Sequence, residues 1–576
     1  MSELAKHCCP KKVAVVVVAG IAVYGAAMKV REWERKKQLL KKASEKKDLE
    51  NAIIKQELEQ SEKYDEEERN KILNMKANEL IRAAQQGELD PVHILRAYIH
   101  KACTVTQKFN SVTGINRDAE NNAKQLKNGN NNTHRPLYGL PFSIKECCDI
   151  KGMDTTIGLV NLIGIPAKED CVLVKVLKHC GAIPFAKTNL PQLMFSFESS
   201  NPVYGETGNP HNVDFTPGGS SSGEGSLIGS GGSLLGFGTD TGGSIRCPAH
   251  MSGVCGLKPT LNRLSIVGLG NILPGSNCVT TSVGPLATDV DTLVLAMRAI
   301  LCPLMFELDR TVPPIPFNDE VYSSKKRLRI GYYLDDGYME PVPAVKRAVV
   351  EAKEALEKAG HELIPFHVPR IADAMKILVS LFFADAGEFN QKRLKIDFVG
   401  KRLENLYQQW SLSDLKCKLL SMFKSPRLRQ DLLLHKGGDR STTRLWSLAR
   451  DAAAFVDHYT ALWLNLNLDA MICPAFPVVA CPKGGISNVS AMASHTALYN
   501  MLNYPAGVVP VTKVNQKDIE DLENYKGHYQ DEWDQHIKEV TKGSIGMPVG
   551  VQCVAPTWQD ELCLRVMHEV EEQLKK

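Results

Sequence analysis

The chain opens with an uncharged segment that is followed by a densely charged one. Residues 13–28 (VAVVVVAGIAVYGAAM) carry no charged side chain. Residues 29–86 carry many lysines and glutamates with leucine and isoleucine interspersed, a composition that favours a long helix until Gly87 ends it. Asp90 and Pro91 then supply an N-cap and a first-turn proline, so a new helix begins there. We expect a solvated helical stalk over residues 31–87 and a globular domain over residues 88–576.

The uncharged segment predicts a membrane anchor over residues 1–30. Its 16 residues would form a helix of about 24 Å, short of a hydrocarbon core of roughly 30 Å. A lysine pair before it and small residues at 25–27 also fit a cleavable signal peptide. Three lysines precede the segment and nine lysines and arginines follow it within residues 29–47, which places the rest of the chain in the cytosol. We therefore expect a single-pass protein of internal membranes such as the endoplasmic reticulum, in which the glycosylation sequons at Asn131 and Asn488 stay unused.

The composition of the whole chain is that of a globular protein. Hydrophobic residues make up 43% of the 576 residues and charged residues 23%, so a sizeable core can form. Lysine and arginine number 69 against 65 aspartates and glutamates, too even a balance for a general nucleic-acid-binding surface. The 16 cysteines include no C-x-x-C pair, so we expect reduced, mostly buried thiols and no zinc site.

A glycine- and serine-rich stretch at residues 218–243 is the strongest candidate for chemistry. It holds 11 glycines and 6 serines, a linker-like composition, but it also holds apolar residues that a linker would not bury. Exposed backbone N–H groups in such a stretch could bind an oxyanion. Residues 219–223 also match G-x-S-x-G, which would make Ser221 a nucleophile, but the polar, proline-broken segment before them is no buried strand. Residues 181–188 resemble a nucleotide-binding loop but lack its second glycine.

Four blocks in fixed order resemble the amidase signature family. They are LPFSIKE at 140–146, TPGGSS at 216–221, GTDTGGSIRCP at 238–248 and GVCGLKPT at 253–260. The likeness extends from about residue 80 to about residue 570, and four linked blocks are far more specific than a lone G-x-S-x-G. The resemblance implies an α/β fold in which one domain has a mixed central β-sheet surrounded by α-helices. With the anchor, the expected fold class is this α/β domain behind an N-terminal transmembrane helix.

The resemblance implies a Ser-Ser-Lys catalytic triad. Carried over position by position, the nucleophile falls on Ser244, the bridging serine on Ser220 and the base on Lys145. A lysine removes a serine proton only where its surroundings keep the amine neutral. Ser220 would relay protons and return one to the departing amine, which lets a poor leaving group leave. No metal or organic cofactor is implied.

The resemblance also assigns supporting roles around the nucleophile. Ser221 corresponds to a hydrogen-bonding partner in the triad network. Ser222 is a departure, because many relatives have glycine there, and serine would cost stability if that position needs a positive φ. The oxyanion hole would use the backbone N–H groups of Thr241, Gly242, Gly243 and Ser244.

Residues 403–434 predict a membrane-binding cap within the globular domain. Apolar side chains alternate there with lysine and arginine, and Pro426 splits the segment into two helices. This pattern suits the headgroup region of a bilayer, although two amphipathic helices packed on the core are the alternative. The position matches the membrane cap of the family members that act on fatty acid amides. The side chains expected to face the membrane include Trp410, Leu419, Met422 and Phe423.

Further residues resemble the acyl pocket of those family members. Met194, Phe195 and Phe197 correspond to its aromatic wall, and Thr496 and Trp533 to other pocket positions, although a phenylalanine pair is also common in a plain core. The implied substrates are N-acylethanolamines and primary fatty amides, cleaved through an acyl-enzyme to free fatty acid and amine. The implied partners are these lipid amides, the membrane and a second copy in a homodimer.

The segment at residues 310–316 (RTVPPIP) fits a different class of function. Its basic-x-x-P-x-x-P form, with prolines at Pro313 and Pro316, fits an SH3-domain ligand, whereas a connecting loop is the ordinary interpretation. The motif would suit a membrane-anchored, lipid-binding adaptor with an inactive amidase site. The intact Lys145, Ser220 and Ser244 argue against such an adaptor.

Overall fold

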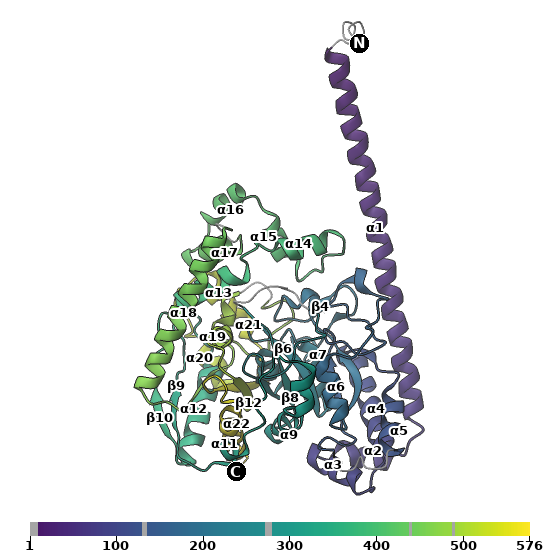
Figure 1. The fold of residues 1–576 in the computed structure, drawn as a ribbon. Helices are drawn as coiled ribbons and strands as arrows, with labels where there is room; N and C mark the ends of the chain where they lie inside the picture. The colour runs from purple at the N-terminus through teal and green to yellow at the C-terminus, as the bar shows by residue number, and fades with distance from the viewer. Residues whose placement is uncertain (1–9, 129–134, 271–278, 437–439, 487–489, 576) are drawn as a thin grey trace.

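The computed structural model describes residues 10–128, 135–270, 279–436, 440–486 and 490–575. The sequons at Asn131 and Asn488 lie outside the described residues. An eleven-stranded mixed sheet forms the centre of the fold, and helices cover it (Figure 1). The strands in spatial order are β1 (Val112–Ile115), β3 (Ile183–Thr188), β2 (Pro141–Lys145), β6 (Leu235–Asp240), β8 (Ser282–Ala287), β7 (Cys255–Lys258), β12 (Ala506–Lys513), β13 (Pro548–Val554), β11 (Ala470–Pro474), β9 (Arg329–Tyr332) and β10 (Glu362–Pro365).

The pairing of β2 with β6 decides where the functional residues meet. Every residue of both strands is buried, as expected for strands covered on both faces. The two strands are parallel neighbours, with Ser143 opposite Gly236 and Ile144 opposite Phe237. Their carboxyl ends therefore lie at one edge of the sheet, where Lys145 ends β2 and Asp240 ends β6. This confirms the mixed sheet surrounded by helices.

The covering helices are mostly short and separated by loops. A small hairpin of β4 (Ser200–Asn201) and β5 (Gly205–Glu206) stands apart from the main sheet. The helices of the body are α2 (Glu66–Leu73), α3 (Ala77–Gln85), α4 (Pro91–Phe109), α5 (Ala119–Asn128), α6 (Val172–His179), α7 (Ser222–Gly229), α8 (Arg246–Ser252), α9 (Val290–Ile300), α10 (Pro303–Leu308), α11 (Asp319–Ser323), α12 (Pro343–Lys358), α18 (Thr442–Asn465), α19 (Ser494–Met501), α20 (Gln516–Leu522), α21 (Glu532–Thr541) and α22 (Asp560–Leu574), with the 3-10 turns η2 (Val160–Leu162), η3 (Gln192–Met194) and η4 (Ser490–Ala493).

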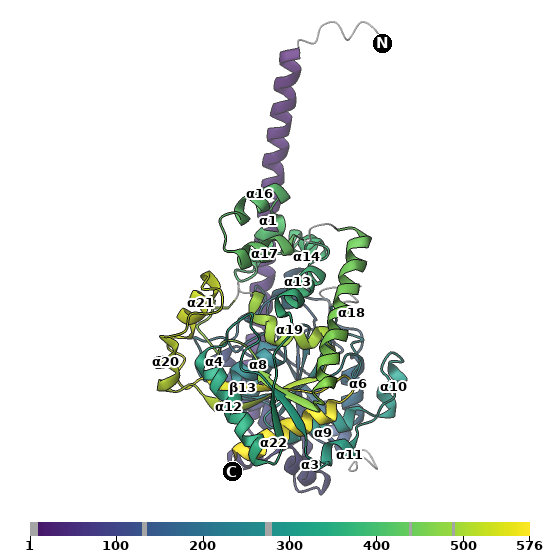
Figure 2. The same cartoon turned by 90° about the vertical axis from the view of Figure 1, so that its left-hand side faces the viewer.

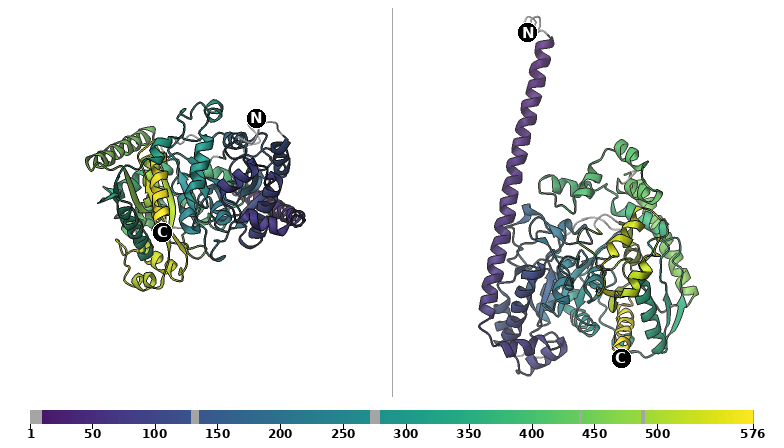
Figure 3. Two further views of the ribbon diagram at one scale, coloured as in Figure 1. Left: turned by 90° about the horizontal axis from the view of Figure 1, so that it is seen from below. Right: turned by 180° about the vertical axis from the view of Figure 1, so that it is seen from behind.

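The first helix, α1 (Pro10–Ser61), is continuous for 52 residues. Its first half projects from the body, and its second half runs along it (Figures 1 and 3). That second half packs against α4 and β1 and buries Ala43, Ile53 and Ile54, so this part of the expected stalk is not solvated on all sides.

No helix in the described part of the chain is long and apolar enough to cross a membrane. The transmembrane helix predicted over residues 1–30 is therefore not supported. The apolar and charged segments are joined by residues that favour helix, with no helix-breaking residue between them. Residues 10–61 therefore form one helix with no boundary at residue 30. The side chains of residues 10–18, 20–22 and 25 lie outside the described part of the chain.

The segment predicted as a cap lies beside the body at the end toward which α1 projects (Figures 1 and 2). Leu419, Met422 and Phe423 are 52%, 65% and 86% exposed, as a membrane-facing surface requires. Trp410 is different, because only 2% of it is exposed and its ring packs against Phe195 and Phe383. Its expected place on the membrane face is therefore wrong. The helices of this region are α13 (Ile371–Phe382), α14 (Glu388–Lys395), α15 (Glu404–Ser411), α16 (Asp414–Ser421) and α17 (Pro426–His435).

A buried ion pair joins α17 to the body. Arg427 donates from Nε and Nη2 to Asp531 at 2.8 and 2.6 Å, and from Nη2 to Asp534 at 2.9 Å. Its guanidinium also lies over the ring of Trp533, 5.1 Å from the centroid. The sequence pattern grouped Arg427 with the basic residues facing lipid headgroups, but its charge is satisfied inside the protein.

The predictions for the cysteines and for the proline motif can be compared with the structure. Of the thirteen cysteines in the described part, all except Cys302 are buried, which confirms the buried thiols; their reduced state stays a prediction. In the proline motif, Val312 is buried, and Arg263 donates to the carbonyl oxygens of Ile315 and Pro316. The motif is thus held against the body, and its use by an SH3 domain stays a prediction.

We predict that Arg427→Met lowers the free energy of unfolding by about 3–5 kcal/mol, because it leaves two buried carboxylates without their cation. Urea unfolding followed by circular dichroism measures this. Arg429→Met is the matched control, since Arg429 is exposed on the same helix and should change stability little. Equal stability of both variants would contradict the proposed anchoring of α17.

Candidate active site

Lys145 ends β2 with its side chain completely buried. Its Nζ donates to Ser220 Oγ at 2.7 Å and to Thr239 Oγ1 at 2.8 Å. No carboxylate among the described residues forms an ion pair with it. Burial lowers the pKa of Lys145 because a dry environment penalises the ammonium form. The amine therefore sits between two hydroxyl groups in surroundings that favour its neutral form.

Ser220 and Ser221 immediately precede α7, which begins at Ser222. Ser221 is also buried, and its backbone N–H donates to the carbonyl oxygen of Ser244 at 3.0 Å, while its Oγ lies against the backbone of Thr239. Ser221 does not line the cavity, so the alternative in which it is the nucleophile is disfavoured. Ser222 begins α7 without a positive φ, so serine causes no backbone strain there. Its Oγ is buried and has no hydrogen-bond partner in the part of the chain that the structure describes.

The loop after β6 is shaped by the buried carboxylate of Asp240. That carboxylate accepts from the N–H groups of Gly243 at 2.8 Å and Ile245 at 3.0 Å, and from Arg246 Nε at 3.0 Å and Nη2 at 2.9 Å. Burial alone would raise the pKa of Asp240, but the Arg246 guanidinium and these donors hold it well below its usual range. Gly243 is thereby removed from the set of free oxyanion donors. The N–H groups of Thr241, Gly242 and Ser244 have no acceptor among the described residues.

Thr496 supports this loop from behind. Its Oγ1 donates to the carbonyl oxygen of Gly242 at 2.5 Å. Gly243 has a φ of +131°, and a Cβ at that position would lie 2.5 Å from Thr496 Oγ1. Glycine is therefore required here for both space and conformation.

Glu224 is a buried carboxyl near Lys145. It accepts from Ser143 Oγ at 2.6 Å and Thr188 Oγ1 at 2.7 Å, which ties α7 to β2 and β3. Burial raises the pKa of Glu224 to about 8, so it is mostly protonated at neutral pH. It consequently adds little negative charge near Lys145, which helps the amine to remain neutral.

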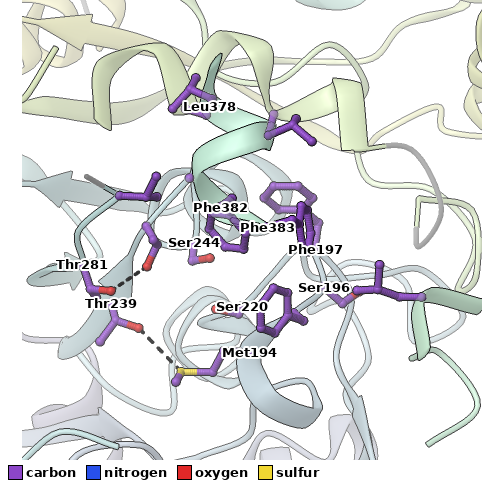
Figure 4. A pocket seen from close by; sticks show the side chains of 18 of the residues that line it. Met194, Ser196, Phe197, Ser220, Thr239, Ser244, Thr281, Leu378, Phe382 and Phe383 are labelled. Atoms are coloured by element: carbon purple, nitrogen blue, oxygen red, sulfur yellow. Dashed lines mark hydrogen bonds between the residues drawn. The ribbon is translucent and has the colours of Figure 1, made fainter. Parts of the chain in front are cut away.

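A cavity of about 310 Å³ opens onto the two serines. Figure 4 shows Ser220 and Ser244 at the cavity beside Phe382 and Phe383. The ring of Phe195 packs against both phenylalanines, with centroids 5.4 and 6.2 Å apart. The residues predicted for this site that line the cavity are Met194, Phe195, Phe197, Ser220, Thr241, Gly242 and Ser244.

Two predicted pocket residues lie elsewhere. Thr496 bonds to the loop after β6, Trp533 packs against Arg427, and neither residue lines the cavity. Both are buried, so their apolar or small character reflects packing and not contact with a ligand in this cavity.

A family model described as amidase matches residues 93–564. The chain belongs to the amidase signature family. Fatty-acid amide hydrolase 1 of Sus scrofa is 44% identical over 502 residues, covering 87% of this chain and 86% of that protein. Fatty acid amide hydrolase 1 of Caenorhabditis elegans is 39% identical over 524 residues, covering 90% and 91%. A solved structure of "Fatty acid amide hydrolase" superposes with a TM-score of 0.77 and 25% identity, covering 94% of this chain and 95% of that one.

In this amidase signature protein, several site residues were not singled out from the sequence. Thr239 holds Lys145, and Asp240 and Arg246 shape the oxyanion loop. All three lie inside the signature block at 238–248, so their position in that block could have indicated a role in the site. The wall formed by α13, including Leu378 and Phe382, carried no motif and follows only from the packing of the chain.

We predict that Gly243→Ala slows fluorophosphonate labelling of the enzyme by roughly tenfold or more, or about 1.4 kcal/mol in the barrier, because the new methyl group displaces the oxyanion loop. Gel fluorescence over time measures the labelling rate. Gly543→Ala is the control, since Gly543 also has a positive φ but nothing lies within 4 Å of its added Cβ. A normal labelling rate in folded Gly243→Ala would show that the loop tolerates the collision.

Proposed function

We propose that this protein is a serine hydrolase that cleaves fatty acid amides to free fatty acid and amine through an acyl-enzyme on Ser244. The observation that carries the proposal is the completely buried Lys145 amine, held by the hydroxyl groups of Ser220 and Thr239 beside an apolar cavity. The similarity to fatty acid amide hydrolases over most of the chain supports the choice of substrate.

The proposed first half-reaction forms the acyl-enzyme. Neutral Lys145 takes the proton of Ser220 while Ser220 takes that of Ser244, and Ser244 Oγ bonds to the amide carbon. The amide oxygen becomes negative and is stabilised by the free N–H groups of Thr241, Gly242 and Ser244. Ser220 then gives a proton to the nitrogen and regains one from Lys145, so the amine leaves neutral.

The second half-reaction restores the enzyme. Water loses a proton through the same relay and attacks the ester carbon. The bond to Ser244 breaks, Ser244 regains its proton, and the fatty acid leaves. The chain's own side chains carry every proton in this scheme.

The walls of the cavity support a long acyl chain as the substrate. Met194, Phe195, Leu378 and Phe382 give it apolar, aromatic sides next to the nucleophile. N-acylethanolamines and primary fatty amides combine such a chain with an amide bond at its end. These substrates partition into bilayers, so an entrance near a membrane-binding surface would shorten their route.

We further propose that the cap attaches to membranes through α16 and the turn that follows it. Support comes from Leu415, Leu419, Met422 and Phe423, which are all more than half exposed and interleave with lysines at 416, 418 and 424. Attachment at internal membranes and pairing into a homodimer stay predictions from the family resemblance.

We predict that Ser244→Ala and Lys145→Ala abolish most fatty amide hydrolysis while circular dichroism stays unchanged. Release of free fatty acid from a long-chain primary amide measures the rate. Ser222→Ala is the matched control, because Ser222 Oγ is buried without a partner and its loss removes no hydrogen bond. Mass spectrometry should place the fluorophosphonate adduct on Ser244.

The pH dependence of the hydrolysis rate distinguishes a catalytic base at Lys145 from a lysine with only a structural role. Lys145 acts in its neutral form, so the rate of the parent enzyme should rise with pH through a pKa below the usual 10.5 and then level off. Lys145→Ala should lose that rise. An adduct on Ser221, or parental turnover with the same pH profile in Lys145→Ala, would overturn the triad.

We predict that Phe423→Asp combined with Met422→Asp weakens binding to phospholipid vesicles by roughly tenfold or more, because two apolar contacts are replaced by charges. Vesicle co-sedimentation of the full chain measures this. Ile545→Asp is the control, as Ile545 is 51% exposed but lies outside the cap. If the double variant and the control bind alike, the cap is not the attachment surface.

A further inference from the structure

The side of the cavity formed by the cap helices carries polar side chains. Gln409 comes from α15, and Asp431 and His435 come from α17, while Arg402 precedes α15. An entirely apolar acyl chain would leave these groups facing hydrocarbon, which is costly for any that lack a protein partner. Their hydrogen bonds therefore indicate what this part of the cavity is suited to bind.

The imidazole of His435 has one nitrogen bound to protein and one free. Its Nδ1 lies 2.8 Å from the backbone carbonyl oxygen of Asp431, which can only accept, so Nδ1 carries a proton. Nε2 has no partner among the described residues, and it is not one of their fully buried polar atoms. The ring is 4% exposed and packs on Phe383 with centroids 4.2 Å apart. Nε2 is thus a hydrogen-bonding atom reachable from the cavity.

Gln409 provides a second unused group in the same wall. Its residue is half-buried, and its side-chain amide makes no hydrogen bond within the described residues. An amide can both donate and accept, so it can pair with a ligand group of either kind.

The charges around these two residues disfavour an anionic ligand group. The Arg402 side chain donates from Nε to Glu206 at 3.0 Å and lies 3.9 Å from Glu198, so two carboxylates already offset its charge. The Asp431 carboxylate lies 3.4 Å from His435 Nδ1. A neutral hydroxyl fits better, because it can donate to a bare Nε2 or accept from a protonated one.

The position of the polar groups points to the acyl chain and not to the amine. The aromatic contacts run from Phe195 through Phe383 to His435, so the aromatic wall of the cavity continues into α17 of the cap. A chain whose amide lies at Ser244 would pass this aromatic wall before it reaches α15 and α17.

We propose that Gln409 and His435 form a polar subsite that binds a hydroxyl group on the distal half of the substrate's acyl chain. This inference rests on the proposed fatty amide hydrolysis and refines its substrate class. Substrates that carry such a hydroxyl gain a hydrogen bond that unsubstituted chains of the same length lack.

The test compares two primary fatty amides of equal length, one with a hydroxyl in its distal half and one without. We expect the ratio of kcat/KM, hydroxylated over plain, to fall at least fivefold in His435→Leu and in Gln409→Leu, and less in His435→Asn, which keeps a hydrogen-bonding group. Arg429→Met, on the exposed face of α17, should keep the parental ratio. An unchanged ratio in both leucine variants overturns the proposal.

A second measurement tests the polar subsite independently of the proposed hydrolysis. Dissociation constants of the same two amides are measured with the Ser244→Ala protein, with and without His435→Leu, by competition with a fluorescent fatty acid. The hydroxylated amide should bind more tightly only when His435 is present. If the parent cleaves neither amide, the proposed function fails, and the binding ratio still decides the subsite.

Discussion

The site depends on the burial of one lysine amine, which favours its uncharged form inside the protein. Lys145 Nζ is surrounded by hydroxyl groups and buried side chains, so its ammonium form loses hydration without gaining an ion pair. This environment exists only because β2 and β6 are parallel neighbours that end together at one edge of the sheet. The catalytic geometry is therefore a consequence of strand order, and any change that separates these two strands would rehydrate the amine.

The same dry environment obliges the protein to satisfy its other buried charges locally. Asp240 does this with Arg246 and two backbone N–H groups, and Arg246 extends the network to Asn500 and Gln552. The network fixes the loop so that some N–H groups point at Asp240 and others stay free. The ion pair of Asp240 and Arg246 thus determines which backbone N–H groups remain free to bind an oxyanion.

The sequence predicted the parts of the fold and site that local patterns encode, and missed those that depend on which way a helix faces. The signature blocks bring Ser220 and Ser244 to one cavity, with Lys145 bonded to Ser220 behind it, because glycine-rich turns constrain the backbone locally. Trp410 and Arg427 were assigned to the membrane face because their segment alternates apolar and basic residues. That alternation does not reveal which tryptophan or arginine turns inward, since the partners Phe195, Asp531 and Asp534 are distant in sequence.

Helix α17 shows how these inward contacts link the cap to the cavity. Near its start Arg427 is held by two aspartates of the body, and at its end His435 stacks on Phe383 in the cavity wall. The preceding turn meanwhile exposes Met422 and Phe423 to the outside. Residues of one short stretch of chain therefore anchor the cap to the body, form its exposed apolar surface and line the cavity. If the proposed cap binds a bilayer, a displacement of α17 would also move the cavity wall at His435. The Arg427 ion pair with Asp531 and Asp534 opposes such a displacement because it ties the start of the helix to the body.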